Sequence, residues 1–222
     1  AVVRNPTPRL QKDNVPCYPH VVPQMFAALT GNQTGGRLLR WYRDQLGAEE
    51  RTTAERERRD VYDVIVDQTT DEPSGLMILP HFAGSGSLQN DPKSKGAILG
   101  LTFDTRREDL VKAILEGITF EQALSIRQLR TAGIEVNELR AIGGGARSEK
   151  WLQMKADIIG TPICAVDVSD AASLGAALLA GWGTGVYASL RAGVERTLSI
   201  GARYEPDEKR RAHYQDQLGV YE

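Results

Sequence analysis

The sequence has few of the residues that mark secreted, metal-binding or nucleic-acid-binding proteins. Its 222 residues include only two cysteines, Cys17 and Cys164, and three histidines that share no motif. Two isolated cysteines provide neither a disulfide framework nor zinc-site spacing, so a reducing cytoplasm is the expected location. The 27 basic and 29 acidic residues give a net charge of −2, which offers no basic field to nucleic acid.

Long apolar runs are absent as well. No stretch approaches the roughly 20 apolar residues that cross a membrane, and no signal peptide is recognisable, so no membrane partner is expected. With 41% hydrophobic and 25% charged residues, the composition is that of a globular chain. A chain of 222 residues can bury a core as one large domain or two small ones. Its abrupt start at Ala-Val-Val, without methionine, leads us to expect a fragment.

The most informative stretch is residues 138–162, which reads as strand, glycine turn, helix and strand. Residues 139–142 are apolar enough for a buried strand, and three consecutive glycines end it. Because Gly143, Gly144 and Gly145 carry no Cβ, the main chain can turn at positive φ and a ligand can approach it closely. The alternative is a tight turn that binds nothing.

A helix is expected directly after the glycines, with Ser148 as its N-cap. Its inner side would carry Trp151, Leu152, Met154 and Ile158. A helix N-terminus that follows the carboxyl end of a strand is where α/β folds bind nucleotides. The turn and the cap together therefore predict a nucleotide site.

The same stretch nearly matches the dinucleotide fingerprint G-x-G-x-x-G. Gly143, Gly145 and Ser148 occupy its three positions, and Asp167 ends the next apolar strand about where a ribose-binding acid would stand. Against this, Ser148 replaces the third glycine, and the sequence after Asp167 shows no further strand. An NAD-binding Rossmann-type oxidoreductase domain is therefore the second interpretation.

Hydrophobic periodicity organises the rest of the chain into an α/β pattern. Four short apolar segments are predicted as strands of one sheet: 74–80, 97–101, 139–142 and 163–167. The strongest helical pattern covers 106–131, with a cap at residue 104 or 105 and Gly133 as its stop. Other segments are predicted as helices: 37–46, 49–60, 148–160, 171–181 and 205–218. This order predicts a layered α/β domain with helices on the sheet faces.

Several short motifs occur in an order that points to one family. Residues 96–101 and 109–116 together form a two-part signature, and residues 35–44 read G-G-x-x-x-x-W-x-R-D. Residues 91–96 read D-P-x-x-K-G, and residues 173–177 read S-L-G-A-A. These motifs, spread over most of the chain, make it resemble the C-terminal domain of the FGGY carbohydrate kinases.

This resemblance implies an α/β domain of the actin-like ATPase (ribonuclease H-like) fold, with a mixed sheet and helices on both faces. Residues 1–222 would be the nucleotide-binding C-terminal domain of a sugar kinase, a fragment without the N-terminal sugar-binding domain. The parent would use ATP and Mg²⁺ to phosphorylate a sugar or polyol hydroxyl, with a xylulose-like pentulose favoured. It would be cytoplasmic, with a homodimer as one possible state. A non-catalytic actin-like interaction module that kept the fold is the third interpretation.

The resemblance also assigns a cofactor site. Six residues are carried over to it: Gly36, Arg40, Gly143, Gly144, Gly145 and Ser148. Gly144 and Ser148 would contact the adenine, with the flanking glycines keeping the turn open, and Gly36 and Arg40 would meet the phosphates and ribose. Arg40 and Ser148 stand where glycerol kinases carry glutamine and asparagine, so different adenine contacts are expected. The family's phosphate loop and catalytic aspartate would precede Ala1, so no catalytic residue and no metal ligand is expected in this chain.

Overall fold

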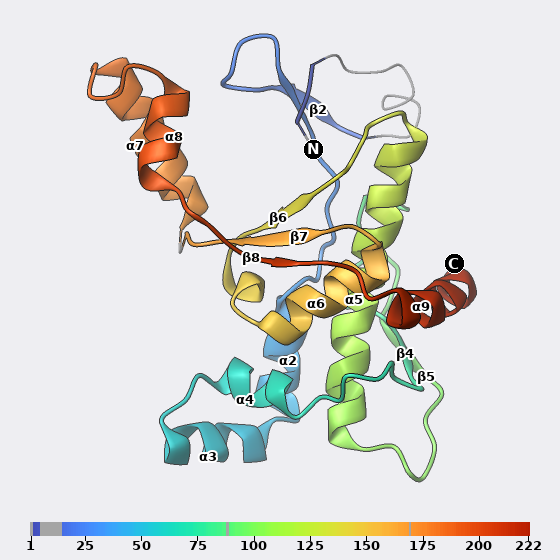
Figure 1. Ribbon diagram of the computed structural model, residues 1–222. Coiled ribbons are helices and arrows are strands. Elements are labelled where there is room, and N and C mark those ends of the chain that lie inside the picture. The colour runs from blue at the N-terminus through green and yellow to red at the C-terminus, as the bar shows by residue number, and fades with distance from the viewer. Residues whose placement is uncertain (1, 5–14, 88, 169) are drawn as a thin grey trace.

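The computed structural model describes residues 2–4, 15–87, 89–168 and 170–222. Figure 1 shows one long helix, α5, through the centre, with the other elements arranged around it. The strands are β1 (Val2–Val3), β2 (Cys17–Pro19), β3 (Phe26–Ala28), β4 (Met77–Leu79), β5 (Ala97–Leu99), β6 (Leu139–Ala141), β7 (Ile163–Val166) and β8 (Ile200–Tyr204). The helices are α2 (Arg37–Gln45), α3 (Ala48–Glu57), α4 (Val61–Asp67), α5 (Arg107–Thr131), α6 (Glu149–Ile159), α7 (Ala171–Gly183), α8 (Leu190–Thr197) and α9 (Glu208–Tyr221), with a short 3₁₀ turn, η1 (Gly144–Ala146).

Helix α5 confirms the strongest helical prediction. Its N-cap is Arg106 rather than residue 104 or 105, and the main-chain N–H of Arg106 donates to Asp109 Oδ2 at 2.9 Å. This contact satisfies one of the amides that a helix start leaves unpaired. Gly133, at φ +87°, follows its C-terminus as predicted.

The strands form three separate sheets in the described part of the chain, with orders β1-β3-β2, β4-β5 and β6-β7-β8. In the last, β6 and β7 run parallel and β8 runs antiparallel to β7, so this sheet is mixed. The parallel pair is joined through α6, which packs against β7 and β8. The α/β class and the mixed sheet are therefore confirmed.

The prediction that the four apolar segments share one sheet is wrong. In the described residues β4 and β5 form a two-stranded sheet of their own, and β4 packs on α5, while β6 and β7 belong to the mixed sheet. A glycine on α5 allows the close approach of β4: a Cβ at Gly117 would collide with the main-chain carbonyl of Ile78. Because Gly117 has no side chain, β4 lies directly against the helix.

One large core joins the hairpin, the helices and the mixed sheet. It includes Leu38 from α2, Ile78 from β4, Ile118 from α5, Leu152 from α6 and Ile163 from β7, all fully or almost fully buried. A smaller cluster holds the N-terminal sheet against the end of α5: Val15, Ala28, Leu129, Ala132 and Ile134. The two clusters make α5 the element on which the other layers rest.

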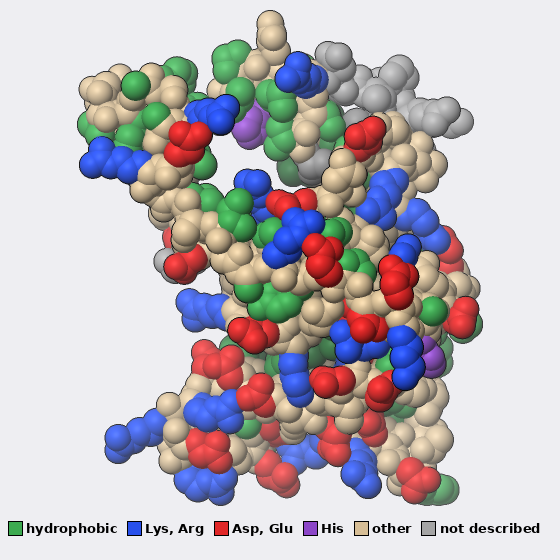
Figure 2. All heavy atoms as spheres, in the orientation of Figure 1, with side chains coloured by type: hydrophobic (Ala, Val, Ile, Leu, Met, Phe, Trp, Pro, Cys, Tyr) green, Lys and Arg blue, Asp and Glu red, His purple; other side chains and the backbone are tan. Residues whose placement is uncertain are grey.

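Helices α7 and α8 pack mainly on each other and stand away from this core, as Figures 1 and 2 show. α7 was predicted over 171–181 and runs two residues further, whereas α8 and β8 were not predicted. α9 begins three residues later than the predicted 205 and ends three later than 218. None of the helices in the described ranges is long and apolar enough to cross a membrane.

Candidate functional site

A cleft of about 590 Å³ opens between α2, α4 and the glycine turn before α6. Five of the six residues predicted for the nucleotide line it: Gly36, Arg40, Gly144, Gly145 and Ser148. Arg37, Leu39, Asp60, Tyr62, Asp63, Val66, Arg147 and Trp151 complete the lining. Two segments about a hundred residues apart in sequence thus meet at one cleft.

The structure gives a different reason for a glycine at each of the three positions of the turn. Gly143 has φ +79°, a conformation that side chains rarely adopt. A Cβ on Gly145 would lie 3.0 Å from the Trp151 ring, so a side chain there would press on the indole. A Cβ on Gly144 would meet no heavy atom within 4 Å, and its φ is not in the left-handed range. Gly144 therefore leaves bare main chain facing the cleft without any packing demand of its own.

Gly143 is the predicted residue that the structure places elsewhere. It lines a second hollow of about 350 Å³ with Ala165, Asp167 and Gly201, on another side of the turn. Gly143 is expected to keep the turn open and to allow a positive φ, and its φ of +79° agrees with that role. The three-residue turn η1 then carries the chain to the helix, so strand and helix are not directly joined.

Ser148 is the N-cap of α6, as predicted. Its Oγ accepts a hydrogen bond from the main-chain N–H of Trp151 at 3.3 Å, and the four predicted inner residues of the helix are buried. Trp151 in turn donates from Nε1 to Thr119 Oγ1 of α5 at 3.2 Å, which fixes the indole at the floor of the cleft. The cap and the tryptophan thus tie the glycine turn to the central helix.

The opposite wall comes from the start of α2. Gly36 is its N-cap and makes no side-chain cap, and a Cβ there would meet nothing within 4 Å. Arg40 lies one turn further along and is exposed. Among the described residues, no carboxylate forms an ion pair with Arg40, Arg37 or Arg147, all of which line the cleft. Three unpaired guanidinium groups favour an anionic ligand there.

Helix α4 supplies a third wall that the sequence did not predict. Asp60 caps this helix by accepting from the Tyr62 N–H at 2.8 Å, and the Tyr62 hydroxyl accepts from Arg43 Nη1 at 3.0 Å. Asp63 lies in its first turn. The only local signal was a capping aspartate before an apolar run, which predicts a helix but not its contact with residues 144–151.

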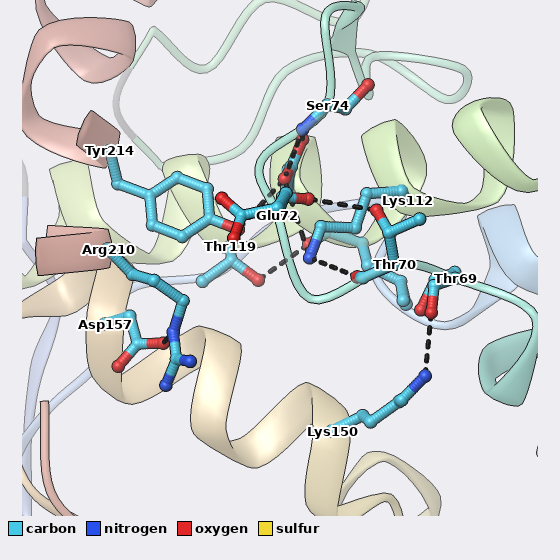
Figure 3. Close-up of polar contacts among 12 residues, drawn as sticks. Thr69, Thr70, Glu72, Ser74, Lys112, Thr119, Lys150, Asp157, Arg210 and Tyr214 are labelled. Atoms are coloured by element: carbon cyan, nitrogen blue, oxygen red, sulfur yellow. Dashed lines mark hydrogen bonds and ion pairs between the residues drawn. The ribbon is translucent and has the colours of Figure 1, made fainter. Parts of the chain in front are cut away.

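A second polar site lies on the other side of α6 and is shown in Figure 3. It surrounds a hollow of about 270 Å³ where Lys112 Nζ donates to the Thr70 carbonyl at 3.0 Å and Arg210 Nε donates to Asp157 Oδ2 at 2.7 Å. Burial raises the pKa of Glu116, beside Lys112, to about 7. These charged groups have partners in one another and in the main chain. The cluster therefore connects α5, α6 and α9, and we do not assign a ligand to it.

No group of three or more His, Cys, Asp or Glu able to hold a metal ion occurs within 2–4, 15–87, 89–168 and 170–222. Asp60 and Asp63 are the carboxylates of the cleft, and one of them is used as a helix cap. The side chains of the cleft therefore do not by themselves make a magnesium cage, for which six oxygen ligands would be needed.

The dinucleotide interpretation does not fit this geometry. A Rossmann half continues with a third parallel strand, but the strand beside β7 is β8, which runs antiparallel. Asp167, the expected ribose-binding acid, lines the hollow with Gly143 and lies outside the cleft of Gly144 and Ser148. The fingerprint residues are thus divided between two sides of the turn.

Comparisons with known proteins point to one family of enzymes. Residues 2–184 match the model of the FGGY family of carbohydrate kinases, C-terminal domain. The chain is 29% identical over 209 residues to the xylulose kinase of Staphylococcus epidermidis, covering 94% of this chain and 41% of that protein. It is 29% identical over 236 residues to the autoinducer-2 kinase of Enterobacter sp., covering 99% and 44%.

Two solved structures extend the likeness to the fold. One, described as a xyloylose kinase from Brucella ovis, superposes with a TM-score of 0.83 at 25% identity, over 100% of this chain and 43% of that one. The other, a glycerol kinase from Plasmodium falciparum with ADP, gives a TM-score of 0.73 at 25% identity, over 89% and 38%. The chain spans less than half the length of these relatives. The match over residues 2–184 shows that the chain belongs to the FGGY family of carbohydrate kinases and corresponds to its C-terminal domain.

Proposed function

We propose that this chain is the nucleotide-binding domain of an ATP-dependent carbohydrate kinase, which phosphorylates a hydroxyl of a sugar or polyol. The observation that carries the proposal is the bare main chain of Gly144 facing a cleft lined by Arg37, Arg40 and Arg147. A flat base can stack close to a glycine main chain, while guanidinium groups attract phosphates. The ADP named with the Plasmodium falciparum glycerol kinase supports a nucleotide as the ligand.

Within the cleft each group has a defined task. Gly144 and Gly36 leave room for the nucleotide, Trp151 forms an apolar floor, and Arg40 provides charge at the edge. Phosphoryl transfer depends chiefly on positioning and charge stabilisation. A rigid cleft that orients the nucleotide would therefore contribute substantially to catalysis. Mg²⁺ would supply charge neutralisation on the phosphates, held by phosphate oxygens rather than by a cage of these side chains.

The substrate and the missing groups belong to the same proposal. Residues 1–222 would act with a sugar-binding domain that supplies the hydroxyl-activating base, and a xylulose-like pentulose is the favoured substrate because the matched relatives include xylulose kinases. The parent enzyme would work in the cytoplasm, and a homodimer is one state it could adopt. The described cleft contains no His, Lys or Cys. Its two aspartates lie at the start of α4, beside the site proposed for the adenine ring.

Calorimetric titration of the chain tests the proposal. ATP and ADP should bind with measurable heat and in competition with each other, while NAD should give no saturable signal. Binding of NAD in preference to ATP would favour an oxidoreductase domain. Binding of neither nucleotide would favour an interaction module that has kept the fold without the ligand.

A further inference from the structure

His81 is a buried histidine that joins the loop between β4 and β5 to the central helix. Its Nδ1 lies 2.8 Å from the hydroxyl oxygen of Ser94 in that loop, and its Nε2 lies 3.3 Å from Glu121 Oε1 of α5. The hydroxyl of Tyr221 in α9 donates to the same carboxylate oxygen at 2.8 Å. Two elements are therefore attached to one buried acid, the loop through His81 and α9 through Tyr221.

The residues on either side of this histidine both reach α2, and we call residues 80–82 the strap. The main-chain carbonyl of Pro80 accepts a hydrogen bond from the buried hydroxyl of Thr34, just before α2. The ring of Phe82 meets the ring of Trp41 edge-on, with the ring centroids 5.0 Å apart. The strap thus holds α2 at its start and again within the helix.

The start of α2 depends on this support because its N-cap, Gly36, has no side chain to make a cap. The first amide of the helix, that of Arg37, donates instead to the main-chain carbonyl of Thr34 at 2.9 Å. The first turn of α2 therefore rests on the residue that the strap holds. Since Gly36 and Arg40 line the cleft, a shift of the strap would move one wall of the cleft.

The other wall of the cleft is attached to the same part of α5. Trp151 of α6 donates to Thr119 Oγ1, and Thr119 lies two residues before Glu121 in the helix. One short part of α5 thus carries both walls, the α6 side through Thr119 and the α2 side through Glu121 and His81. Glu121 is almost fully buried, and loss of a hydrogen-bond donor to a buried carboxylate is costly.

We propose that His81 is a positioning residue for nucleotide binding, which acts through Glu121 to hold the strap and the α2 wall in place. This inference rests on the proposed function, because it assigns the cleft to a nucleotide. His81 does not itself line the cleft, so its effect reaches the ligand through the contacts of the strap with Thr34 and Trp41. The contact with Glu121 carries this role and needs a proton on Nε2, whereas the contact with Ser94 serves only the loop.

Two substitutions of His81 separate its two contacts. The amide nitrogen of a glutamine can replace Nε2, and that of an asparagine can replace Nδ1. In calorimetry His81→Gln should therefore keep the ATP affinity within about twofold of the wild type, whereas His81→Asn should weaken it by about tenfold. In hydrogen exchange the amides of residues 37–40 should exchange faster in His81→Asn than in His81→Gln or the wild type.

Two controls distinguish positioning from general stability. Tyr221→Phe removes the other donor to Glu121 Oε1 and leaves the strap attached. It should lower the melting temperature while ATP affinity and exchange at residues 37–40 stay as in the wild type. His213→Asn, a matched change at an exposed histidine of α9, should alter none of these three quantities.

The outcomes separate this role from the proposed function. Equal ATP affinities of His81→Asn and the wild type, or equal losses in His81→Asn and His81→Gln, would overturn the role of the contact with Glu121. So would an ATP affinity that follows the melting temperature through all variants, Tyr221→Phe included. If the wild type binds no nucleotide but exchange at residues 37–40 responds to His81→Asn alone, the link from His81 to α2 stands and the proposed function fails.

Discussion

The carboxylate of Glu116 on α5 accepts a hydrogen bond from the hydroxyl of Tyr214 on α9 at 3.0 Å, across 98 positions of sequence. The same carboxylate accepts from the N–H of Ser74 at 3.0 Å and lies 3.9 Å from Lys112 Nζ. Figure 3 shows Ser74, Lys112 and Tyr214 among the polar residues of this region. One buried acid thus joins the C-terminal helix, the entry to β4 and the central helix.

The first prediction concerns the pH dependence of stability. Burial raises the pKa of Glu116 from 4.5 to about 7. Between these pH values the folded chain therefore keeps a proton on Glu116 that the unfolded chain has lost. This contribution is complete below about pH 4.5 and is lost as the pH rises through 7, to a total of roughly 3 kcal/mol. Urea unfolding between these pH values should show this decline in the wild type, and Glu116→Gln should remove it.

The control for this prediction is Glu208→Gln, which alters an exposed carboxylate of α9. It should keep the wild-type pH dependence. Since Glu116→Gln also removes the carboxylate beside Lys112, the free energy of unfolding at one pH is not the readout. An unchanged pH slope in Glu116→Gln would show that Glu116 is ionised in the folded chain across this range.

The local parts of the fold could be predicted from the sequence. Helix α5, the capped helix α6 and the glycine turn follow from periodicity, Ser148 and Gly143, because each signal lies within the element that it defines. The division into separate sheets could not, because it depends on packing between distant segments, such as the contact of Gly117 with β4 about forty residues away. Strand β8 was missed because four of its five residues are exposed and show no alternation.

The candidate site was predicted in the same unequal way. Five of its residues lie in motifs, but the wall formed by Asp60 and Tyr62 depends on how α4 packs, which no motif records. The sequence also does not show toward which side a turn opens, and Gly143 lines a different hollow from Gly144 and Gly145.

The second prediction is that the isolated chain does not phosphorylate sugars. A base that activates the hydroxyl is assigned to the sugar-binding domain, and removing it leaves the nucleotide without a positioned acceptor. In a coupled assay with a panel of pentuloses, hexuloses and polyols, the rate of ADP release should equal the background rate measured without the protein. Turnover that survives rigorous purification would place the base in this chain, with Asp60 and Asp63 as the first residues to change.

The third prediction separates two roles of Ser148. As the N-cap of α6 it accepts from the Trp151 N–H, and its loss in Ser148→Ala should cost about 1 kcal/mol of stability. If it also contacts the base, the affinity for ATP should fall by more than that for tripolyphosphate. The comparison variant is Ser189→Ala, which removes the cap of α8 far from the cleft and should leave ATP affinity unchanged. Equal losses for ATP and tripolyphosphate would limit Ser148 to capping.

The fourth prediction concerns the bare main chain at Gly144. Since a Cβ there meets no heavy atom within 4 Å and the backbone has no positive φ, Gly144→Val should fold with nearly the wild-type melting temperature. Its side chain would instead occupy the cleft and oppose the nucleotide, at a cost of a few kcal/mol, the scale of overpacking a tight site. ATP affinity measured by calorimetry should therefore collapse while thermal unfolding barely shifts.

Two neighbouring glycines make the test decisive, because each has a different reason for being glycine. Gly143→Val should lower the melting temperature through its positive φ, and Gly145→Val should do so by pressing on Trp151. Gly75→Val, at another open glycine remote from the cleft, should leave both melting and ATP affinity near wild type. If Gly144→Val bound ATP as tightly as Gly75→Val does, the glycine turn would have no part in the nucleotide site, and the base would have to lie against α4 instead.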